Sequence, residues 1–143
     1  MIVVEQLKKA DPQALEELTA LAHALHCDVR MPEAADLEAM TQDKNTILMV
    51  VREDGRIIGM ATLYIIQKLG RRSASMEDVI VEEGHRGQGL GTRLVSALIE
   101  EGKKRGIGSI SLTSRAERVA AHKLYESLGF AKRDTDVFKL TLS

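Results

Sequence analysis

Apolar residues recur along the chain with two periods, one typical of helices and one typical of strands. In helical stretches they return every three or four residues, as Leu90, Leu94 and Leu98 do. In strand stretches they alternate with polar residues or form short continuous runs. These patterns predict strands over residues 1–7, 47–51, 57–66, 75–81 and 109–113, and helices over 11–26, 32–41, 90–105 and 117–128. Residues 131–142 are expected to form two further short strands or one bent hairpin.

Turn and cap residues set the limits of these elements. Asp11-Pro12 is typical of a helix start, and Asp54-Gly55 is typical of a tight hairpin turn. Gly59 inside a strand predicts a bulge. Ser114 and Glu117 form a capping-box pattern before the last helix, which Gly129 is expected to end. Because strands and helices are interleaved, the chain is expected to form a mixed α/β sheet.

Composition narrows the class of protein. The chain has 143 residues, 44% hydrophobic and 29% charged, which predicts one soluble domain over residues 1–143. With 3% aromatic residues and a net charge of −1, neither a base-stacking surface nor a basic nucleic-acid surface is expected. No membrane span or export signal is recognised. Cys27 is the only cysteine, which excludes a disulfide within the chain and predicts a cytoplasmic location.

Four of the eleven glycines lie between Gly84 and Gly91, in the turn that joins a buried strand to a helix. Glycine lets the backbone approach a ligand closely, and the helix start presents N–H groups that have no partner within the helix. Arg86 adds a charged donor, worth about 1.5–3 kcal/mol for each hydrogen bond. The turn therefore predicts a site for an anion such as a phosphate or pyrophosphate.

Three other interpretations of this turn fit less well. A P-loop requires Gly-Lys-Ser/Thr at the helix start, where this chain has Gly89-Leu90. A dinucleotide fingerprint requires a third glycine, where the chain has Thr92 or Leu94, and an acidic residue about 20 positions further on, which residues 109–113 lack. A turn that served only the path of the chain would leave its arginine and the amphipathic helix unexplained.

The same turn resembles the acyl-CoA pyrophosphate loop of the GNAT superfamily of N-acetyltransferases, written Arg/Gln-x-x-Gly-x-Gly/Ala. Here the motif runs from Arg86 to Gly91. Residues 121–130 resemble the family's second motif, in which a helical tyrosine, here Tyr125, lies near the thioester and Leu-Gly-Phe begins the next strand. The predicted order of elements is also that of the family's fold. One departure is Arg118, which stands where many members have asparagine.

The resemblance implies a mixed α/β fold: a central, mostly antiparallel sheet of about six to seven strands, with a splayed parallel pair, flanked by about four helices. It also implies acetyl-CoA as the acyl donor, without a metal, and a pantetheine arm that replaces a strand in the gap between the splayed pair. The residues expected to contact acetyl-CoA are Val79, Ile80, Val81, Arg86, Gly87, Gln88, Gly89, Leu90, Gly91, Thr92, Arg115 and Arg118.

The implied reaction, attack of an amine on the thioester, requires two proton transfers. A primary ammonium with a pKa near 10.4 is the free base in about one molecule in 2,500 at pH 7, a cost of about 4.6 kcal/mol. Glu77 and Asp78 are the candidate bases. Strict alternation puts them on opposite faces of the strand, with Asp78 on the face of Met76 and Ile80, and Glu77 is preferred. The candidate acid that protonates the CoA thiolate is Tyr125.

The expected partners are acetyl-CoA and an amine acceptor, and a homodimer is left open. The acceptor is open between small amines, amino acids, peptide or protein amines and amino sugar phosphates. The last are included because residues 77–81 are similar to a strand of glucosamine-6-phosphate N-acetyltransferases. A non-catalytic acyl-CoA sensor on the same fold is the alternative, disfavoured by the retained tyrosine and carboxylates. A nucleotide- or NAD-binding module is disfavoured by the missing lysine and ribose acid.

The other residues with reactive or aromatic side chains are not assigned to the reaction. His23, His26 and Cys27 are spaced too loosely for a metal site and are expected to pack or lie at the surface. Of the four aromatic residues, Tyr64 and Phe138 are expected in the sheet and Phe130 against the end of the last helix, which leaves Tyr125 for chemistry.

Overall fold

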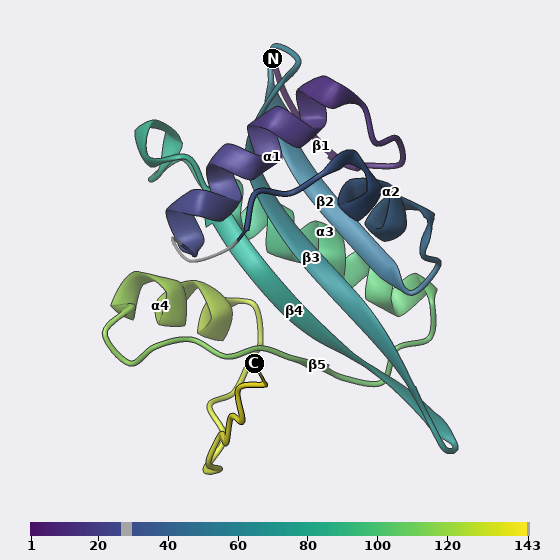
Figure 1. Ribbon diagram of the computed structural model, residues 1–143. Coiled ribbons are helices and arrows are strands. Elements are labelled where there is room, and N and C mark those ends of the chain that lie inside the picture. Colours follow the sequence, from purple (N-terminus) through teal and green to yellow (C-terminus); the bar gives the residue numbers. More distant parts are fainter. Residues whose placement is uncertain (27–29, 143) are drawn as a thin grey trace. The chain divides into compact units, whose positions relative to one another are not determined.

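The computed structural model describes residues 1–26 and 30–142 and divides into two compact units, one from Met1 to Thr113 and one that begins at Ser114. The first unit holds a sheet with the strand order β1-β2-β3-β4-β5 (Figure 1). Its elements are β1 (Ile2–Gln6), α1 (Pro12–Leu25), α2 (Ala34–Gln42), β2 (Thr46–Glu53), β3 (Arg56–Lys68), β4 (Arg71–Val81), the 3₁₀ turn η1 (Glu83–His85), α3 (Leu90–Lys104) and β5 (Ile110–Ser111). The second unit holds α4 (Val119–Ser127).

The sheet is mixed. Neighbouring strands from β1 to β4 pair antiparallel, and β5 pairs parallel to β4. This confirms the predicted mixed, mostly antiparallel sheet with a parallel pair. The parallel pairing covers only Ala74 and Ser75 of β4, which continues to Val81. Beyond Ser75, that edge of β4 has no strand beside it among the described residues.

The prediction of six to seven strands is wrong, since five are found in the described part of the chain. Residues 131–142 form neither helix nor strand there. Their apolar side chains are exposed, with Phe138 at 92% and Leu140 at 84%. Apolar alternation reports the preference of a segment for strand geometry, but a strand also needs a neighbour that satisfies its backbone groups. Phe138 is therefore not a sheet residue.

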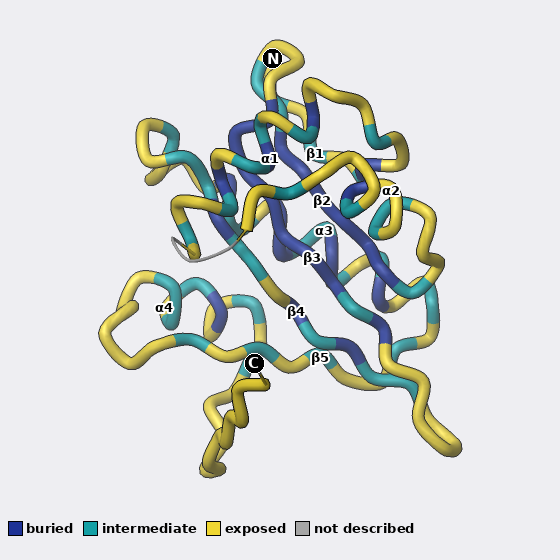
Figure 2. Tube along the Cα trace, in the orientation of Figure 1, coloured by how far each residue is buried: buried dark blue, intermediate teal, exposed yellow. Residues whose placement is uncertain are grey.

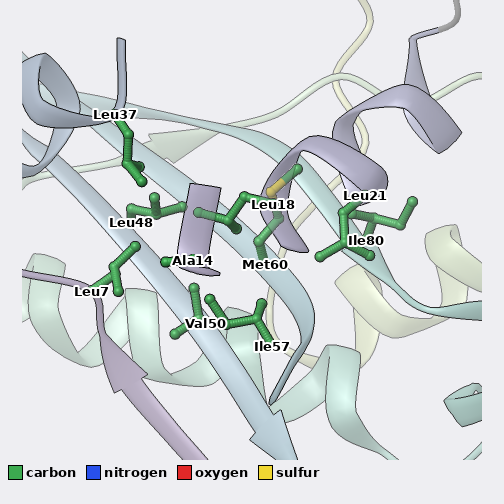
Figure 3. Packing of buried hydrophobic residues seen from close by; sticks show 10 residues of the cluster. All are labelled: Leu7, Ala14, Leu18, Leu21, Leu37, Leu48, Val50, Ile57, Met60 and Ile80. Carbon is green, nitrogen blue, oxygen red and sulfur yellow. The ribbon is translucent and has the colours of Figure 1, made fainter. Parts of the chain in front are cut away.

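The core lies on both faces of the sheet. Helices α1 and α2 cover one face and α3 covers the other, so β2 and β3 are buried along most of their length (Figures 1 and 2). On the α3 face Leu94, Val95 and Leu98 are fully buried. On the opposite face a cluster joins both helices to the strands (Figure 3), and it consists of Leu7, Ala14, Leu18, Leu21, Leu37, Leu48, Val50, Ile57, Met60 and Ile80.

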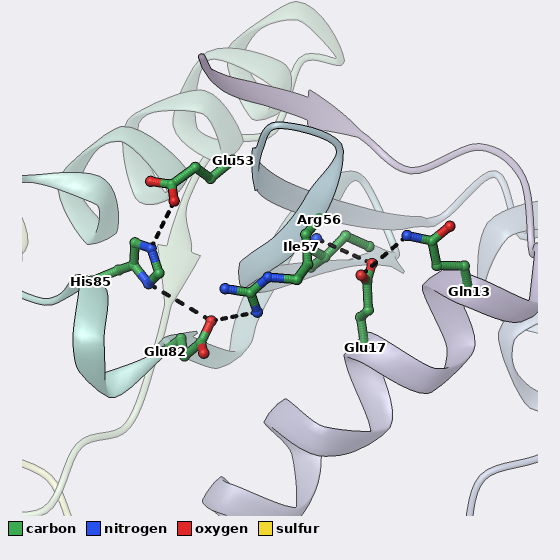
Figure 4. A network of polar contacts seen from close by, with 7 residues as sticks. All are labelled: Gln13, Glu17, Glu53, Arg56, Ile57, Glu82 and His85. Carbon is green, nitrogen blue, oxygen red and sulfur yellow. Dashed lines mark hydrogen bonds and ion pairs between the residues drawn. The ribbon is translucent and has the colours of Figure 1, made fainter.

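A bulge in β3 confirms the role predicted for Gly59. Val51 pairs with Gly59 and Arg52 with Ile57, which leaves Ile58 as the extra residue. A Cβ on Gly59 would lie 2.7 Å from Val51 Cγ1, so a larger residue does not fit there. Glu17 of α1 accepts the Ile57 N–H at 3.1 Å beside the bulge (Figure 4).

A second bulge, in β4, was not predicted. Thr62 pairs with Glu77 and Met60 with Ile80, so that Asp78 and Val79 stand opposite one residue of β3. Asp78 has a φ of +53°, a left-handed conformation in which aspartate is among the more frequent non-glycine residues. The extra residue reverses the alternation, because each residue past the bulge changes face.

Consequently the predicted grouping of Asp78 with Met76 and Ile80 on one face is wrong. Met76 pairs with Leu63, whose side chain lies 3.8 Å from the position of a Cβ on Gly102 of α3. Ile80 instead belongs to the cluster under α1. Met76 and Ile80 thus lie on opposite faces of the sheet, although they are four residues apart in one strand.

Of the three helix caps predicted above, at Asp11, at Gly129 and at residues 114–117, the first two are confirmed. Asp11 accepts the Ala14 N–H at 2.8 Å and caps α1 as predicted. Gly129, with a φ of +99°, ends α4, and the Phe130 N–H donates to the Tyr125 carbonyl at 3.0 Å. The capping box predicted at residues 114–117 is wrong, because α4 begins only at Val119 and a turn precedes it. Within the described residues no helix is long and apolar enough to cross a membrane.

Candidate active site

The glycine-rich turn joins η1 to α3 in the first unit. Gly87 and Gly89 have φ values of +82° and +77°, and Gly89 is the N-cap of α3. Leu90 is buried and anchors the helix start in the core. The Arg93 N–H makes the first helical hydrogen bond, to the Gly89 carbonyl at 3.1 Å. The N–H groups of residues 90–92 therefore have no acceptor inside the helix and point out of its start.

Positive charge gathers at this turn. Arg86 donates from Nε to the Val81 carbonyl at 3.1 Å, which ties its side chain to the end of β4 and leaves its two terminal amino groups as further donors. Arg93 stands in the first turn of α3, and that first turn contains no acidic residue. A cation at the positive end of a helix is unfavourable unless an anion is close. Sequence reasoning missed Arg93, although a cation in a first helical turn is itself a signal for an anion site.

A polar network holds η1, which leads into the turn (Figure 4). His85 Nε2 lies 3.2 Å from Glu53 Oε1 at the end of β2, and His85 Nδ1 lies 3.7 Å from Glu82 Oε2. Arg56 at the start of β3 donates to the same Glu82 oxygen at 2.8 Å. The half-buried imidazole thus connects the beginning of the turn to two strands, which fixes the position of the glycines that follow.

The backbone of β4 is open at the edge that faces β5. The Glu82 N–H donates to the Ile58 carbonyl of β3 at 2.7 Å. By alternation along an antiparallel ladder, the backbone groups of Val79 and Val81 point to the other edge. The Val81 carbonyl accepts from Arg86 there. Val79 therefore presents its N–H and C=O at an edge where the described residues provide no neighbouring strand.

Five side chains form a polar cluster on the α1 side of β4. The Ser75 hydroxyl donates to Glu77 Oε2 at 2.5 Å, and His26 Nε2, just past α1, lies 3.0 Å from Asp78 Oδ1. Tyr64 pairs with Ser75 across β3 and β4, and burial, followed by the charges of Asp78 and Glu77, raises the pKa of Tyr64. The two candidate bases are thus brought together, not separated as strict alternation predicts. His26 and Tyr64 were missed because no local pattern links residues so far apart in the sequence.

The second unit carries Tyr125 on α4 and the two arginines that precede this helix. Tyr125 is buried, and its ring meets Phe130 edge to face at 5.8 Å between centroids. Burial raises the pKa of Tyr125, while Arg118 acts in the opposite direction. Arg115 and Arg118 are exposed. The structure does not bring these residues into the unit that contains the turn and the carboxylates.

The structure offers no metal centre among the residues it describes, since no three His, Cys, Asp or Glu side chains gather as ligands there. Cys27, considered above with His23 and His26, lies outside the described residues.

The mixed sheet and the glycine-rich turn between its open strand and the next helix are the features on which the resemblance to an acyltransferase family rests. The chain belongs to the GNAT acetyltransferase family, because the family model described as "Acetyltransferase (GNAT) family" matches residues 13–130. This match runs across the boundary of the two units and confirms the resemblance found in the two motifs. The family's acyl donor is acetyl-CoA.

Relatives differ in the acceptor that their names state. The chain is 28% identical to the [Ribosomal protein bS18]-alanine N-acetyltransferase of Escherichia coli (strain K12) over 91% of this chain and 81% of that protein. It is 38% identical to the glucosamine 6-phosphate N-acetyltransferase of Trypanosoma brucei brucei over 53% of this chain and 52% of that protein. A crystal structure of an aminoglycoside acetyltransferase from an uncultured soil metagenomic sample matches with a TM-score of 0.85 and 25% identity, covering 100% of this chain and 99% of that one.

Proposed function

We propose that the protein is an N-acetyltransferase that moves an acetyl group from acetyl-CoA to a primary amine by direct attack, with both substrates bound at once. The observation that carries this proposal is the turn over residues 86–92. It combines N–H groups that point out of a helix start, glycines at positive φ and two arginines with no acidic residue in the first helical turn. Such a site suits a doubly charged group like the pyrophosphate of CoA.

The rest of the donor is assigned to the open edge of β4. A pantetheine arm carries amide groups, and Val79 presents a backbone N–H and C=O where no described strand runs alongside. The Val81 carbonyl already accepts a hydrogen bond from Arg86. Val79 is therefore proposed, ahead of Val81, to pair with an amide of the pantetheine arm. Arg115 and Arg118 of the second unit are proposed to contact a CoA phosphate.

Two groups of residues are proposed to manage the protons. Glu77 or Asp78 takes the proton of the incoming ammonium, directly or through water, and their combined negative charge attracts a cationic acceptor. Tyr125 gives a proton to the departing CoA thiolate. Its pKa is raised by burial, so the hydroxyl is protonated at neutral pH and available as a donor. The acceptor candidates are peptide amines, amino sugar phosphates and small amines, including aminoglycosides.

The purified protein is expected to bind acetyl-CoA and CoA in a calorimeter much more tightly than ATP or NAD, since only the former pair carry a pantetheine arm for β4. Release of CoA thiol should then increase when at least one amine of a panel is added; the panel includes an alanine-terminated peptide, glucosamine 6-phosphate and an aminoglycoside. Absence of CoA binding contradicts the proposal. Binding without thiol release on any amine favours the non-catalytic sensor.

Replacing Gly89 by alanine is expected to weaken acetyl-CoA binding about tenfold or more, with little change in kcat. A Cβ disfavours the φ of +77° found there, and a shifted turn loses N–H bonds to the pyrophosphate that are worth about 1.5–3 kcal/mol each. The matched control is Gly84→Ala, because an added Cβ meets no atom within 4 Å at either position and only Gly89 has a positive φ. Equal acetyl-CoA affinities for the two variants, measured by calorimetry, would remove the turn from the donor site.

A further inference from the structure

We propose that His26 is a further catalytic residue of this acetyl transfer: Asp78 holds its Nε2, and its Nδ1 takes the proton of the acceptor ammonium. This proposal rests on the proposed function and decides between its two candidate carboxylates. His26 and Asp78 are 52 residues apart in the sequence, yet His26 Nε2 lies 3.0 Å from Asp78 Oδ1.

The contact defines which ring nitrogen can act as a base. An ionised carboxylate only accepts hydrogen bonds, so Nε2 must carry the hydrogen that Asp78 accepts. Nδ1 of the neutral ring then keeps its lone pair. An imidazole is better matched than a carboxylate to deprotonation near neutral pH, since it is the side chain whose charge ordinarily changes between pH 5 and 8.

The His26 ring lies beside a carboxylate and at the C-terminal end of a helix. Asp78 faces the ring directly, and His26 is the C-cap of α1, where its backbone N–H donates to the Ala22 carbonyl at 2.8 Å. The end of a helix favours positive charge. The other ionisable side chains of the polar cluster are Glu77 and Tyr64.

The bulge places this pair beside the proposed donor. Asp78 directly precedes Val79, whose backbone faces the edge assigned to pantetheine, while the Asp78 side chain reaches the end of α1. The side chains of His26 and Asp78 are 51% and 40% exposed, so an acceptor can reach them. Glu77 is differently engaged, because its Oε2 accepts the Ser75 hydroxyl.

In the proposed step, the ammonium transfers one proton to His26 Nδ1 and its nitrogen gains a lone pair. The nitrogen attacks the acetyl carbonyl, the C–N bond forms and the C–S bond breaks. The thiolate takes a proton from Tyr125, and the second proton lost by the nitrogen restores that tyrosine through water. The imidazolium releases its proton to solvent, so the products are an acetamide, CoA thiol and one proton.

The test compares His26→Gln, His26→Ala, Glu77→Gln and His23→Gln in thiol-release assays with the best amine of the panel. Glutamine keeps an N–H for Asp78 but has no basic nitrogen, so kcat is expected to fall about 100-fold while KM for acetyl-CoA stays unchanged. Added imidazole should restore part of the activity of His26→Ala. His23→Gln, an exposed histidine of the same helix, should stay within about twofold of the wild type.

The outcomes distinguish a failure of the proposed role of His26 from a failure of the proposed function. A wild-type protein that releases no thiol with any amine contradicts the proposed function itself. An active wild type together with a fully active His26→Gln variant contradicts only the role of His26. A 100-fold loss in Glu77→Gln with full activity in His26→Gln assigns the base to Glu77. Unfolding temperatures near the wild-type value, together with imidazole rescue, exclude loss of structure as the cause.

Discussion

A Tyr125→Phe variant is expected to lose about 10²–10⁴-fold in kcat and to keep the acetyl-CoA affinity of the wild type. The CoA thiolate must be protonated as it leaves, and the phenol is the proposed donor. From reference pKa values of 10 and about 8.5 this transfer is uphill by about 2 kcal/mol, and burial, which raises the pKa of Tyr125, adds to that cost. A poorly solvated thiolate reduces it. Thiol release at saturating amine measures the loss.

The phenylalanine ring keeps the packing of the tyrosine, including its edge-to-face contact with Phe130, so the fold should be preserved. Calorimetry with acetyl-CoA and the unfolding temperature serve as controls. Wild-type turnover in this variant removes Tyr125 from the mechanism and leaves protonation of the thiolate to water.

Truncation of Leu98 to alanine is expected to lower the free energy of unfolding by about 2–5 kcal/mol. Leu98 lies on α3 and is fully buried against the sheet. Its removal costs the transfer free energy of the lost methyl groups and leaves a cavity that the packed layer fills only in part. Urea unfolding followed by circular dichroism measures the change as a shift in midpoint.

Leu69→Ala is the matched control, because this leucine is fully exposed in the turn between β3 and β4. The same chemical change there should alter the free energy of unfolding by no more than about 0.5 kcal/mol. A Leu98 variant as stable as the Leu69 variant would show that α3 does not pack on the sheet as the structure has it.

Elements that depend on one or two neighbouring residues could be predicted from the sequence. Asp11 caps its helix, Asp54 and Gly55 both take the positive φ of a hairpin turn, and Gly129 ends α4. Each outcome is decided by local backbone geometry. Residues 131–142 show the limit of such reasoning, since their alternation is typical of a strand but cannot supply a partner for it.

The part of the candidate site that depends on adjacent residues could also be predicted from the sequence, and the part that joins distant segments could not. The turn after β4 has its own composition, so its glycines and Arg86 identify it. The bulge at Asp78 has no glycine to mark it, unlike the bulge at Gly59, and the alternation argument therefore put the two carboxylates on opposite faces. The contact of His26 with Asp78 joins distant segments, and only the packing of α1 on the sheet brings them together.

The bulge in β4 also limits how this strand can change in evolution. Side chains alternate with a period of two and the bulge absorbs one residue, so loss of Asp78 would leave a regular ladder in which Ile80 still pairs with Met60. Ile80 would stay in the core under α1, and what such a deletion removes is the left-handed residue whose side chain reaches His26. Homologues that use the contact between Asp78 and His26 should therefore keep this extra residue, whereas the exposed turn at Leu69-Gly70 can vary in length.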